Sequence, residues 1–287
     1  MVIIAWYGTF PQRDFRMNPV RTLVHFAKIN MESRTLITDL IRRDFRVRYL
    51  GSAMGSYWNF IHPLAMIAIY TVIFSYIMKV RLGDEQTSPL HFTIYLCAGL
   101  LPWTAFQETV LRSSAQFHEH ANFIKKIAFP KEIIQSITTG STTLTFMISM
   151  SFYLLLLLCT GHIPGLSAIC LPFLILAQLL FASGMGMILG VFNVFLRDVQ
   201  QVLNILFQVW FWMTPVVYSI DRIPPFYQKF FLLNPFYYFS RTYQDILVWQ
   251  KWPDFRILGI CLILGLVSYT VGAATLLLFR DQIADEL

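Results

Sequence analysis

Long runs without a charged side chain dominate the chain. Asp, Glu, Lys and Arg are absent from residues 58–78, 133–196, 199–220 and 257–279. The longest run is too long for one crossing, and it breaks at Gly161 to Gly165, where glycine and proline stop a helix. With residues 92–111, which carry Glu108 near one end, the pattern predicts six apolar helices. About 20 apolar residues in a helix span a bilayer core of about 30 Å, so each can cross a membrane.

The predicted fold class is an all-α integral membrane protein with six transmembrane helices. We assign the six-span domain to residues 58–287, an amphipathic interface helix and the start of the first span to residues 30–57, and a cytoplasmic tail of no assigned role to residues 1–29. Composition agrees, because the chain is 56% hydrophobic and only 13% charged, whereas an ordinary soluble domain has about 25% charged residues.

Positive charges are unevenly distributed between the two ends of the predicted helices. Of the 22 Lys and Arg residues, fifteen fall on the side of the two termini and seven on the other side. The positive-inside rule therefore places both termini in the cytoplasm. The net charge of +6 follows from the same bias and does not argue for a nucleic-acid partner.

Residues 30–50 have apolar side chains at every fourth position, namely Ile37, Ile41, Phe45 and Tyr49. This period predicts an amphipathic helix that lies on the inner membrane surface. Its basic side chains are Arg42, Arg43, Arg46 and Arg48. They are explained equally well by attraction to anionic headgroups and by a role in partner docking or substrate access.

The fifth apolar run carries three amides on one helical face, Gln201, Asn204 and Gln208. Amides facing lipid are costly, so they form hydrogen bonds between helices or line a hydrated conduit. We take them as candidate channel-lining residues together with the aromatic residues Tyr70, Phe74, Phe211 and Trp212.

Residues 222–250 are unusually aromatic for a loop on the outer side. Helical spacing on either side of Asn234-Pro235 predicts two short helices that dip back into the outer leaflet between spans five and six. An aromatic belt at the membrane interface explains the composition, and so does a gate at the outer mouth of a pathway. The candidate gate residues are Phe230, Asn234, Pro235, Phe236, Phe239 and Tyr243.

Catalytic signatures are missing from the sequence. It contains no Walker A motif, no H-E-x-x-H, no G-x-S-x-G and no C-x-x-C, and its four cysteines match neither a zinc nor a redox spacing. We therefore expect no catalytic residue, no metal and no cofactor in this chain. Glu108, followed one turn later by Arg112, is most simply an ion pair. The nearly charge-free spans also differ from typical secondary transporters, so transport would need an external motor.

A basic, proline-interrupted segment lies between two apolar runs, within residues 117–131. It combines apolar side chains for a groove, lysines for its rim and a proline that starts the next helix. These features suit an element that docks on a separate ATPase. The candidate coupling residues are Asn122, Phe123, Ile124, Lys125, Lys126, Phe129 and Pro130.

Three stretches resemble the permease subunits of ABC exporters of polysaccharides and polyol phosphates. They are "RRDFRVRYLGSAMGSYWNFIHPL", "NFIKKIAFPKEI" and "TPVVYSIDRIPPFYQKFFLLNPFYYFSRTYQDIL". Their order and spacing match that family from about Asn30 onward. One departure is Phe123, which stands where the family usually has leucine.

The resemblance implies a permease in the bacterial inner membrane, present as two copies with two copies of a separate ABC ATPase that binds ATP and Mg. Its cargo would be a lipid-linked polysaccharide such as O-antigen, capsule or teichoic acid. Because guanidinium suits phosphate, we also expect Arg42, Arg43, Arg46 and Arg48 to receive the phosphate of that lipid carrier. An exporter of small hydrophobic drugs and an integral membrane enzyme acting on polyprenyl-linked sugars are the alternatives.

Overall fold

The computed structural model of the protein describes residues 19–48, 52, 54–77, 89–121, 131–196, 198–220 and 223–286. Every regular element within these residues is a helix, which confirms the all-α class. In chain order the elements are α1 (Pro19–Glu32), α2 (Arg34–Val47), η2 (Gly55–Tyr57), α3 (Trp58–Tyr70), η3 (Thr71–Ile77), α4 (Pro89–Glu119), α6 (Lys131–Cys159), η4 (Leu166–Cys170), α7 (Leu171–Phe195), α8 (Val199–Trp212), α9 (Pro225–Phe231), α10 (Pro235–Leu247) and α11 (Phe255–Glu286).

Three of the described helical stretches are long and apolar enough to cross a membrane. They are Lys131–Cys159, Leu166–Phe195 and Phe255–Ile283, which correspond to α6, η4 with α7, and α11. Trp58–Phe74 is a shorter apolar helix. The predicted run 92–111 lies inside the 31-residue helix α4. These helices support a membrane protein, whereas the full count of six spans stays a prediction.

The predicted fifth span, residues 199–220, is not one continuous helix. Helix α8 ends at Trp212, and its 14 residues rise only about 21 Å against a bilayer core of about 30 Å. The chain then turns, because Pro215 has no N–H to donate and cannot continue the helix. The side chain of Asn234 bonds to the hydroxyl of Thr214 at 2.8 Å and so helps to satisfy this irregular stretch.

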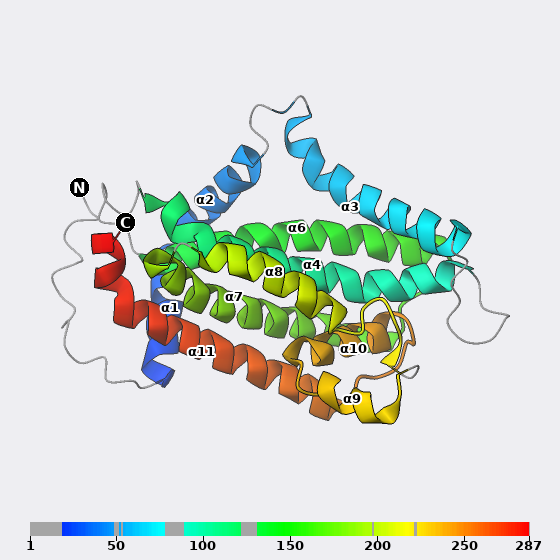
Figure 1. Cartoon of the computed structure of the whole chain (residues 1–287). Coiled ribbons are helices and arrows are strands. Elements are labelled where there is room, and N and C mark those ends of the chain that lie inside the picture. The colour runs from blue at the N-terminus through cyan, green and yellow to red at the C-terminus, as the bar shows by residue number, and fades with distance from the viewer. Residues whose placement is uncertain are drawn as a thin grey trace.

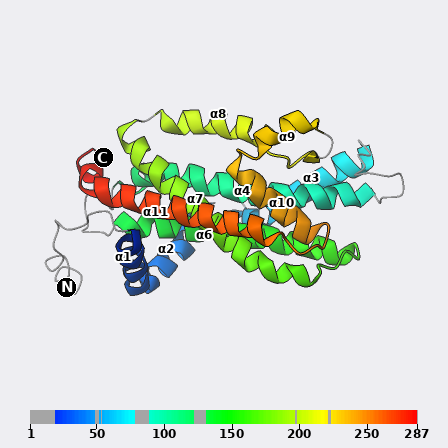
Figure 2. The same ribbon diagram turned by 90° about the horizontal axis from the view of Figure 1, so that it is seen from below.

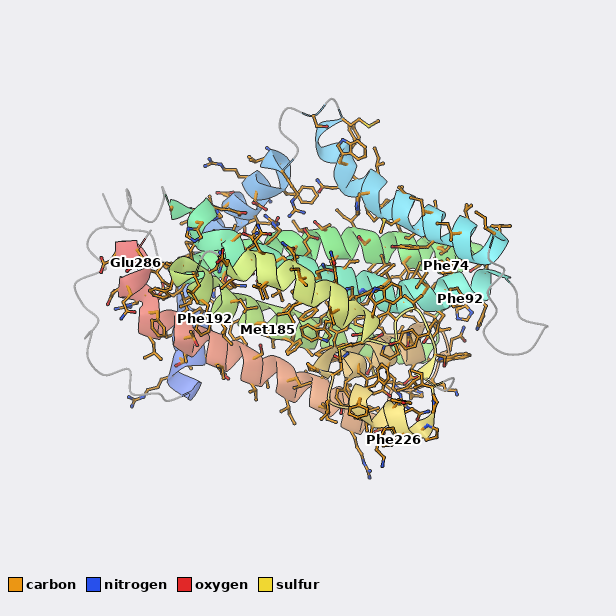
Figure 3. The ribbon with its side chains drawn as sticks, in the orientation of Figure 1. Phe74, Phe92, Met185, Phe192, Phe226 and Glu286 are labelled. Atoms are coloured by element: carbon orange, nitrogen blue, oxygen red, sulfur yellow. The ribbon has the colours of Figure 1, made fainter. Side chains whose placement is uncertain are left out.

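Helix α7 lies in the middle of the bundle, with α11 along one side and α4 along another (Figure 1). Figure 2 shows α8 and α9 along one face of the bundle and α1 at the opposite face. Helix α3 lies against α6, where Phe60 near its start contacts Phe152 with ring centroids 6.5 Å apart, and the η3 segment that continues α3 packs on α4 (Figure 1). There Phe74 lies beside Phe92 of α4, with ring centroids 5.3 Å apart (Figure 3).

An aromatic core joins four helices. Its members are Trp103 and Phe106 of α4, Phe181 of α7, Phe207 of α8 and Phe236 of α10. Each of them is at most 5% exposed. Phe106 stacks on Phe236 at 4.8 Å and on Phe181 at 5.3 Å. Edge-to-face and stacked pairs of this kind each contribute roughly 0.5–1.5 kcal/mol beyond the area that they bury. The core fixes α8 and α10 against α4.

Helix α1 lies mostly within residues 1–29, for which the sequence predicts only a tail. Phe26 is 1% exposed and contacts Tyr269 of α11 edge to face at 6.2 Å. From Pro19 onward, therefore, the chain is a packed helix, because one aromatic side chain anchors it on the bundle. The first 18 residues lie outside the described residues.

Candidate functional site

The three amides of the expected conduit lie on the exposed surface of α8. Gln201, Asn204 and Gln208 are all exposed, and so are the apolar neighbours Ile205 and Trp212, each at 65%. On this helix only Leu203 and Phe207 are buried. An exposed helix face that mixes amides with large apolar side chains fits contact with another molecule better than contact with lipid alone.

The remaining expected conduit residues reach α4 from two helices. Tyr70 and Phe74 pack on each other at 6.2 Å, next to Phe92 of α4. Phe211 of α8 contacts Trp103 of α4 at 5.8 Å. The structure thus places the candidate residues of α3 and α8 around α4 but does not join them into one surface.

The expected gate residues divide into buried and exposed groups. Phe236, Phe239 and Tyr243 have no exposed surface, and the first two belong to or stack on the aromatic core. In the structure they therefore support α10 and line no open passage. Phe230 on α9 is 56% exposed, and it presents its ring outward.

The junction at Asn234-Pro235 is held by one amide side chain. The Oδ1 atom of Asn234 accepts from the indole N–H of Trp210 at 2.7 Å and from the backbone N–H of Phe236 at 3.0 Å. Its amide nitrogen donates to the Met213 carbonyl at 3.0 Å. Pro235 takes the first helical position of α10, where the missing N–H costs nothing. The predicted turn between two short helices is therefore present, fixed to the end of α8.

The four arginines expected at the access site do not form one cluster. Arg42, Arg43 and Arg46 are exposed and line an open surface cleft of about 380 Å³ with Asp39. Arg48 instead turns toward the bundle, where its side chain is only 17% exposed. Arginines about one turn apart therefore face different surroundings: the first three face the open surface, and Arg48 faces the bundle.

An ion network ties the end of α2 to α4 and α6. Arg48 donates to Glu108 at 3.1 Å, to Thr145 at 2.9 Å and to Ser141 at 2.7 Å. Arg112 donates to both carboxylate oxygens of Asp44, at 2.8 and 3.0 Å. Both bonds come from the Nη2 atom of Arg112, and a hydrogen bond between two charged groups is about twice as strong as one between neutral groups. The predicted pair of Glu108 with Arg112 is thus replaced by partners on α2.

Asp44 is the acidic centre of this network. Burial alone would raise the pKa of its carboxyl, but hydrogen bonds from Ser141 and Arg112 and the nearby charges outweigh burial and hold the pKa below its ordinary value of 3.8. Asp44 is therefore ionised at neutral pH. Its charge keeps α2 docked on the bundle.

The seven candidate coupling residues, Asn122, Phe123, Ile124, Lys125, Lys126, Phe129 and Pro130, lie outside the described residues. What the structure describes is the pair of helices on either side of them. Helix α4 runs to Glu119 and α6 begins at Lys131. Residues 117–119 of the expected coupling helix are thus the last turn of α4.

A buried amide cluster joins α4 to α6 directly beside this segment. Gln116 donates to Gln135 at 2.8 Å, and Gln135 donates to Ser113 at 3.0 Å and to Ser183 of α7 at 3.2 Å. Asn193 of α7 donates to the backbone carbonyl of Ser114, the residue after Ser113, at 2.9 Å. We call these five side chains the amide brace. It connects α4, α6 and α7 through side-chain hydrogen bonds, although the buried Oε1 of Gln116 and Oδ1 of Asn193 accept none from the described residues.

Comparison with known proteins decides the family. Residues 35–248 match the family described as ABC-2 type transporter, which is well over half of the chain. The chain belongs to the ABC-2 type transporter family. The match includes α2 except for its first residue, the segment at 122–130 and the short helices α9 and α10.

Several curated relatives cover most of this ABC-2 permease. The O-antigen export system permease protein RfbA of Myxococcus xanthus is 26% identical over 81% of this chain and 87% of its own. A protein of the same name from Klebsiella pneumoniae is 26% identical over 83% and 89%. The polysialic acid transport protein KpsM of Escherichia coli is 24% identical over 70% and 77%. The family resemblance inferred from three sequence stretches is confirmed.

Sequence reasoning missed the amide brace of the permease. One signal was available, because Gln135, Ser183 and Asn193 interrupt a run of 64 residues that has no charge. An amide in such a run is costly unless it is bonded, so it points to a neighbouring helix. Which helix supplies the partner depends on packing, and the sequence does not give it.

No metal site is found in the part of the permease that the structure describes. Within those residues no group of three or more His, Cys, Asp or Glu side chains lies close enough to hold an ion. Cys97, Cys170 and Cys261 are buried free thiols and Cys159 is an exposed one. The curated relatives are named as an export system permease protein and a transport protein.

Proposed function

We propose that this ABC-2 permease is the membrane-spanning subunit of an ATP-driven exporter that moves a lipid-linked polysaccharide, such as O-antigen or a similar glycan, out of the cytoplasm. Two copies work with two copies of a separate ABC ATPase, which binds ATP and Mg. Both termini lie on the cytoplasmic side of the bacterial inner membrane. The relatives named for O-antigen and polysialic acid transport support this class of cargo.

The amide brace is the observation that carries the mechanism. A motor that pushes on residues 122–130 would act on the adjoining ends of α4 and α6, and Gln135 passes the displacement to Ser183 of α7. Because α7 packs along α11 as well as α4, one push would move most of the bundle together. Packed helices joined by hydrogen bonds shift as units, which suits conversion of ATP hydrolysis into a change of helix positions.

The surface of the permease suits a polymer cargo. Exposed amides on α8 can exchange hydrogen bonds with passing hydroxyl groups, and an exposed ring such as Trp212 offers a face to the C–H groups of sugars. These contacts do not demand one register, which a moving chain of repeating units requires. The cleft lined by Arg42, Arg43 and Arg46 would receive the carrier phosphate, since guanidinium suits phosphate.

A double substitution tests the coupling role. In vesicles that contain the permease and its ATPase, we expect Phe123→Ala with Lys126→Ala to lower glycan export about tenfold while ATP hydrolysis continues, because coupling free energies of 1–3 kcal/mol are typical. Export of labelled glycan and phosphate release are measured on the same vesicles.

The control is Lys28→Ala on α1, which removes an exposed lysine whose ion pair with Glu32 is on the surface. Exposed pairs contribute little, so export should be unchanged. Unaltered export in the double variant would refute the coupling role. Uphill transport by the permease alone, without any ATPase, would refute the proposed function as a whole.

A further inference from the structure

A cavity of about 250 Å³ lies between α3 and the bundle. One wall is a stripe of α3 that runs from Asn59 to Tyr70, and the facing wall is a stripe of α4 that runs from Cys97 to Glu108. Thr145 and Ser149 of α6 contribute to it as well. The two stripes repeat at three- and four-residue steps, so each is one continuous helix face. The cavity is thus a slot along the two helices, on the order of 16 Å long by helical rise.

The slot is polar at one end and apolar at the other. Helices α3 and α4 run in opposite directions, as the contact between Phe74 and Phe92 shows. The end near the start of α3 therefore has Arg48, Glu108 and the α6 hydroxyls. The other end is lined by Tyr70 and Cys97 together with Ile67, Leu100 and Leu101, and is mostly apolar. A ligand that fills it must have a polar head and an apolar tail.

The head group of such a ligand must interact with a positive side chain, Arg48, and a negative one, Glu108. Arg48 and Glu108 both line the cavity and form an ion pair with each other at 3.1 Å, while Arg48 also donates to the hydroxyls of Thr145 and Ser141. Glu108 retains a side-chain exposure of 33%. Behind them Asp44 and Arg112 neutralise each other. A purely anionic head would gain from Arg48 but oppose Glu108, whereas a head with phosphate and ammonium meets both.

The outer side of α3 is where such a molecule would come from. Leu64 and Ile69 are 45% and 49% exposed, so the side of α3 that does not line the cavity has open apolar surface. In a membrane this surface faces lipid. We propose that the slot holds one membrane phospholipid with a zwitterionic head, its phosphate on Arg48, its ammonium on Glu108 and an acyl chain along Ile67 and Leu101. The proposal concerns a membrane lipid and not the cargo, so it stands whatever glycan is carried.

Native mass spectrometry of the full-length permease tests the site. The protein is reconstituted in vesicles of phosphatidylethanolamine and phosphatidylglycerol with added polyprenyl phosphate, and the lipids that stay bound after release in mild detergent are identified. We expect one phosphatidylethanolamine per chain. Met66→Trp fills the slot from α3 and should lower its retention about tenfold, since each displaced CH₂ group forfeits about 0.8 kcal/mol of burial.

Ile69→Trp is the matched control, because it makes the same kind of change on the exposed side of α3 and should leave retention unchanged. Glu108→Gln gives a readout that does not depend on cavity volume. It removes the charge that receives the ammonium, so the preference for phosphatidylethanolamine over phosphatidylglycerol should fall about tenfold, as for the loss of one charged hydrogen bond.

Three results would overturn the proposal. They are the absence of retained phospholipid, equal losses in Met66→Trp and Ile69→Trp, and a preference for phosphatidylglycerol or polyprenyl phosphate in the unsubstituted protein. Retained polyprenyl phosphate would make the slot part of the cargo route instead. The glycan-export measurement with Phe123 and Lys126 is independent of all three.

Discussion

At the scale of single residues, Asp44 carries more contacts than its position on a surface helix suggests. Its carboxylate accepts from Arg112 and Ser141 and lies 3.6 Å from Arg48. Only 24% of the Asp44 side chain is exposed, so these interactions are screened less than those of surface pairs. Loss of this one charge would leave the guanidinium of Arg112 without its carboxylate acceptor and would remove a negative charge 3.6 Å from Arg48.

We expect Asp44→Asn to lower the stability of the permease by about 2 kcal/mol, the cost of losing a charged hydrogen bond in a partly buried network. For a chain of this size that corresponds to a fall in Tm of roughly 4 °C in thermal denaturation. Asp39→Asn is the control, because Asp39 lies on the same helix but lines the open surface cleft. Equal Tm values for the two variants would contradict the role of the network.

The same carboxyl predicts a pH dependence with a definite sign. Because the folded pKa of Asp44 is lower than 3.8, its stabilisation is complete above about pH 4 and is lost as the pH falls below 3.8 through the folded pKa. The difference in Tm between the unsubstituted protein and Asp44→Asn should therefore be constant from pH 7 to about pH 5 and shrink in stronger acid. A difference that grows in acid would contradict this assignment.

Residue patterns indicated that Asp44 and Arg48 are paired, but not the rest of the network. Spacing of four predicts Asp44 with Arg48, which the structure confirms at 3.6 Å, and Glu108 with Arg112, which it replaces. Within one helix such pairs contribute only about 0.2–0.5 kcal/mol. Contacts between helices outweigh that small local preference when α2 docks on α4, and sequence spacing holds no information on docking.

At the scale of elements, α7 and α11 approach each other so closely that their backbones touch. A Cβ atom at Gly184 would lie 2.2 Å from the carbonyl of Ser268, and one at Gly272 would lie 2.4 Å from the Gly184 carbonyl. Small residues let membrane helices pack by van der Waals contact where the hydrophobic effect offers no attraction between them. The pair Gly184 and Gly272 therefore sets the distance between the two helices.

Gly184→Ala should force α7 and α11 apart and destabilise the permease by about 2 kcal/mol, within the range for overpacked cores. Gly259→Ala on α11 is the matched control, since no atom lies within 4 Å of the added Cβ. In a helix that control should be neutral or stabilising by up to about 1 kcal/mol. Thermal denaturation of both variants in the same detergent measures the contrast, and equal behaviour would show that the close approach is unimportant.

Helices and turns could be predicted where neighbouring residues in the sequence determine them. The apolar runs and the break near Gly161 follow from composition and backbone chemistry, and so does the turn at Asn234-Pro235. A stop of the fifth span at Pro215 was predicted as well, but α8 already ends at Trp212. The cause of this earlier end is distant in sequence, because Asn234 supplies the hydrogen bonds that make a non-helical backbone tolerable there.

At the scale of the whole molecule, one face of α8 is not covered by any other described helix of the same chain. Val202, Ile205 and Val209 are 52%, 65% and 54% exposed, on the helix that also exposes the three amides. Lipid would accept the apolar side chains but not Gln201, Asn204 and Gln208. A second copy related by twofold symmetry would present the same amides to them, so that donors and acceptors pair across the axis.

The proposed dimer predicts cross-links along α8. In a background with Cys159→Ser, which removes the exposed native thiol, cysteine is placed singly at residues 201, 204 and 208 and treated in membranes with bifunctional maleimides of increasing length. At least one position should give a covalent dimer with a short reagent, because equivalent residues face each other near a twofold axis. Positions that require longer reagents would mark where the two copies diverge around a conduit.

Ile263→Cys on α11, 62% exposed and away from this face, should stay monomeric. Dimers from residue 263 but from none of the α8 positions would place the contact between copies elsewhere and leave the amides of α8 without a partner.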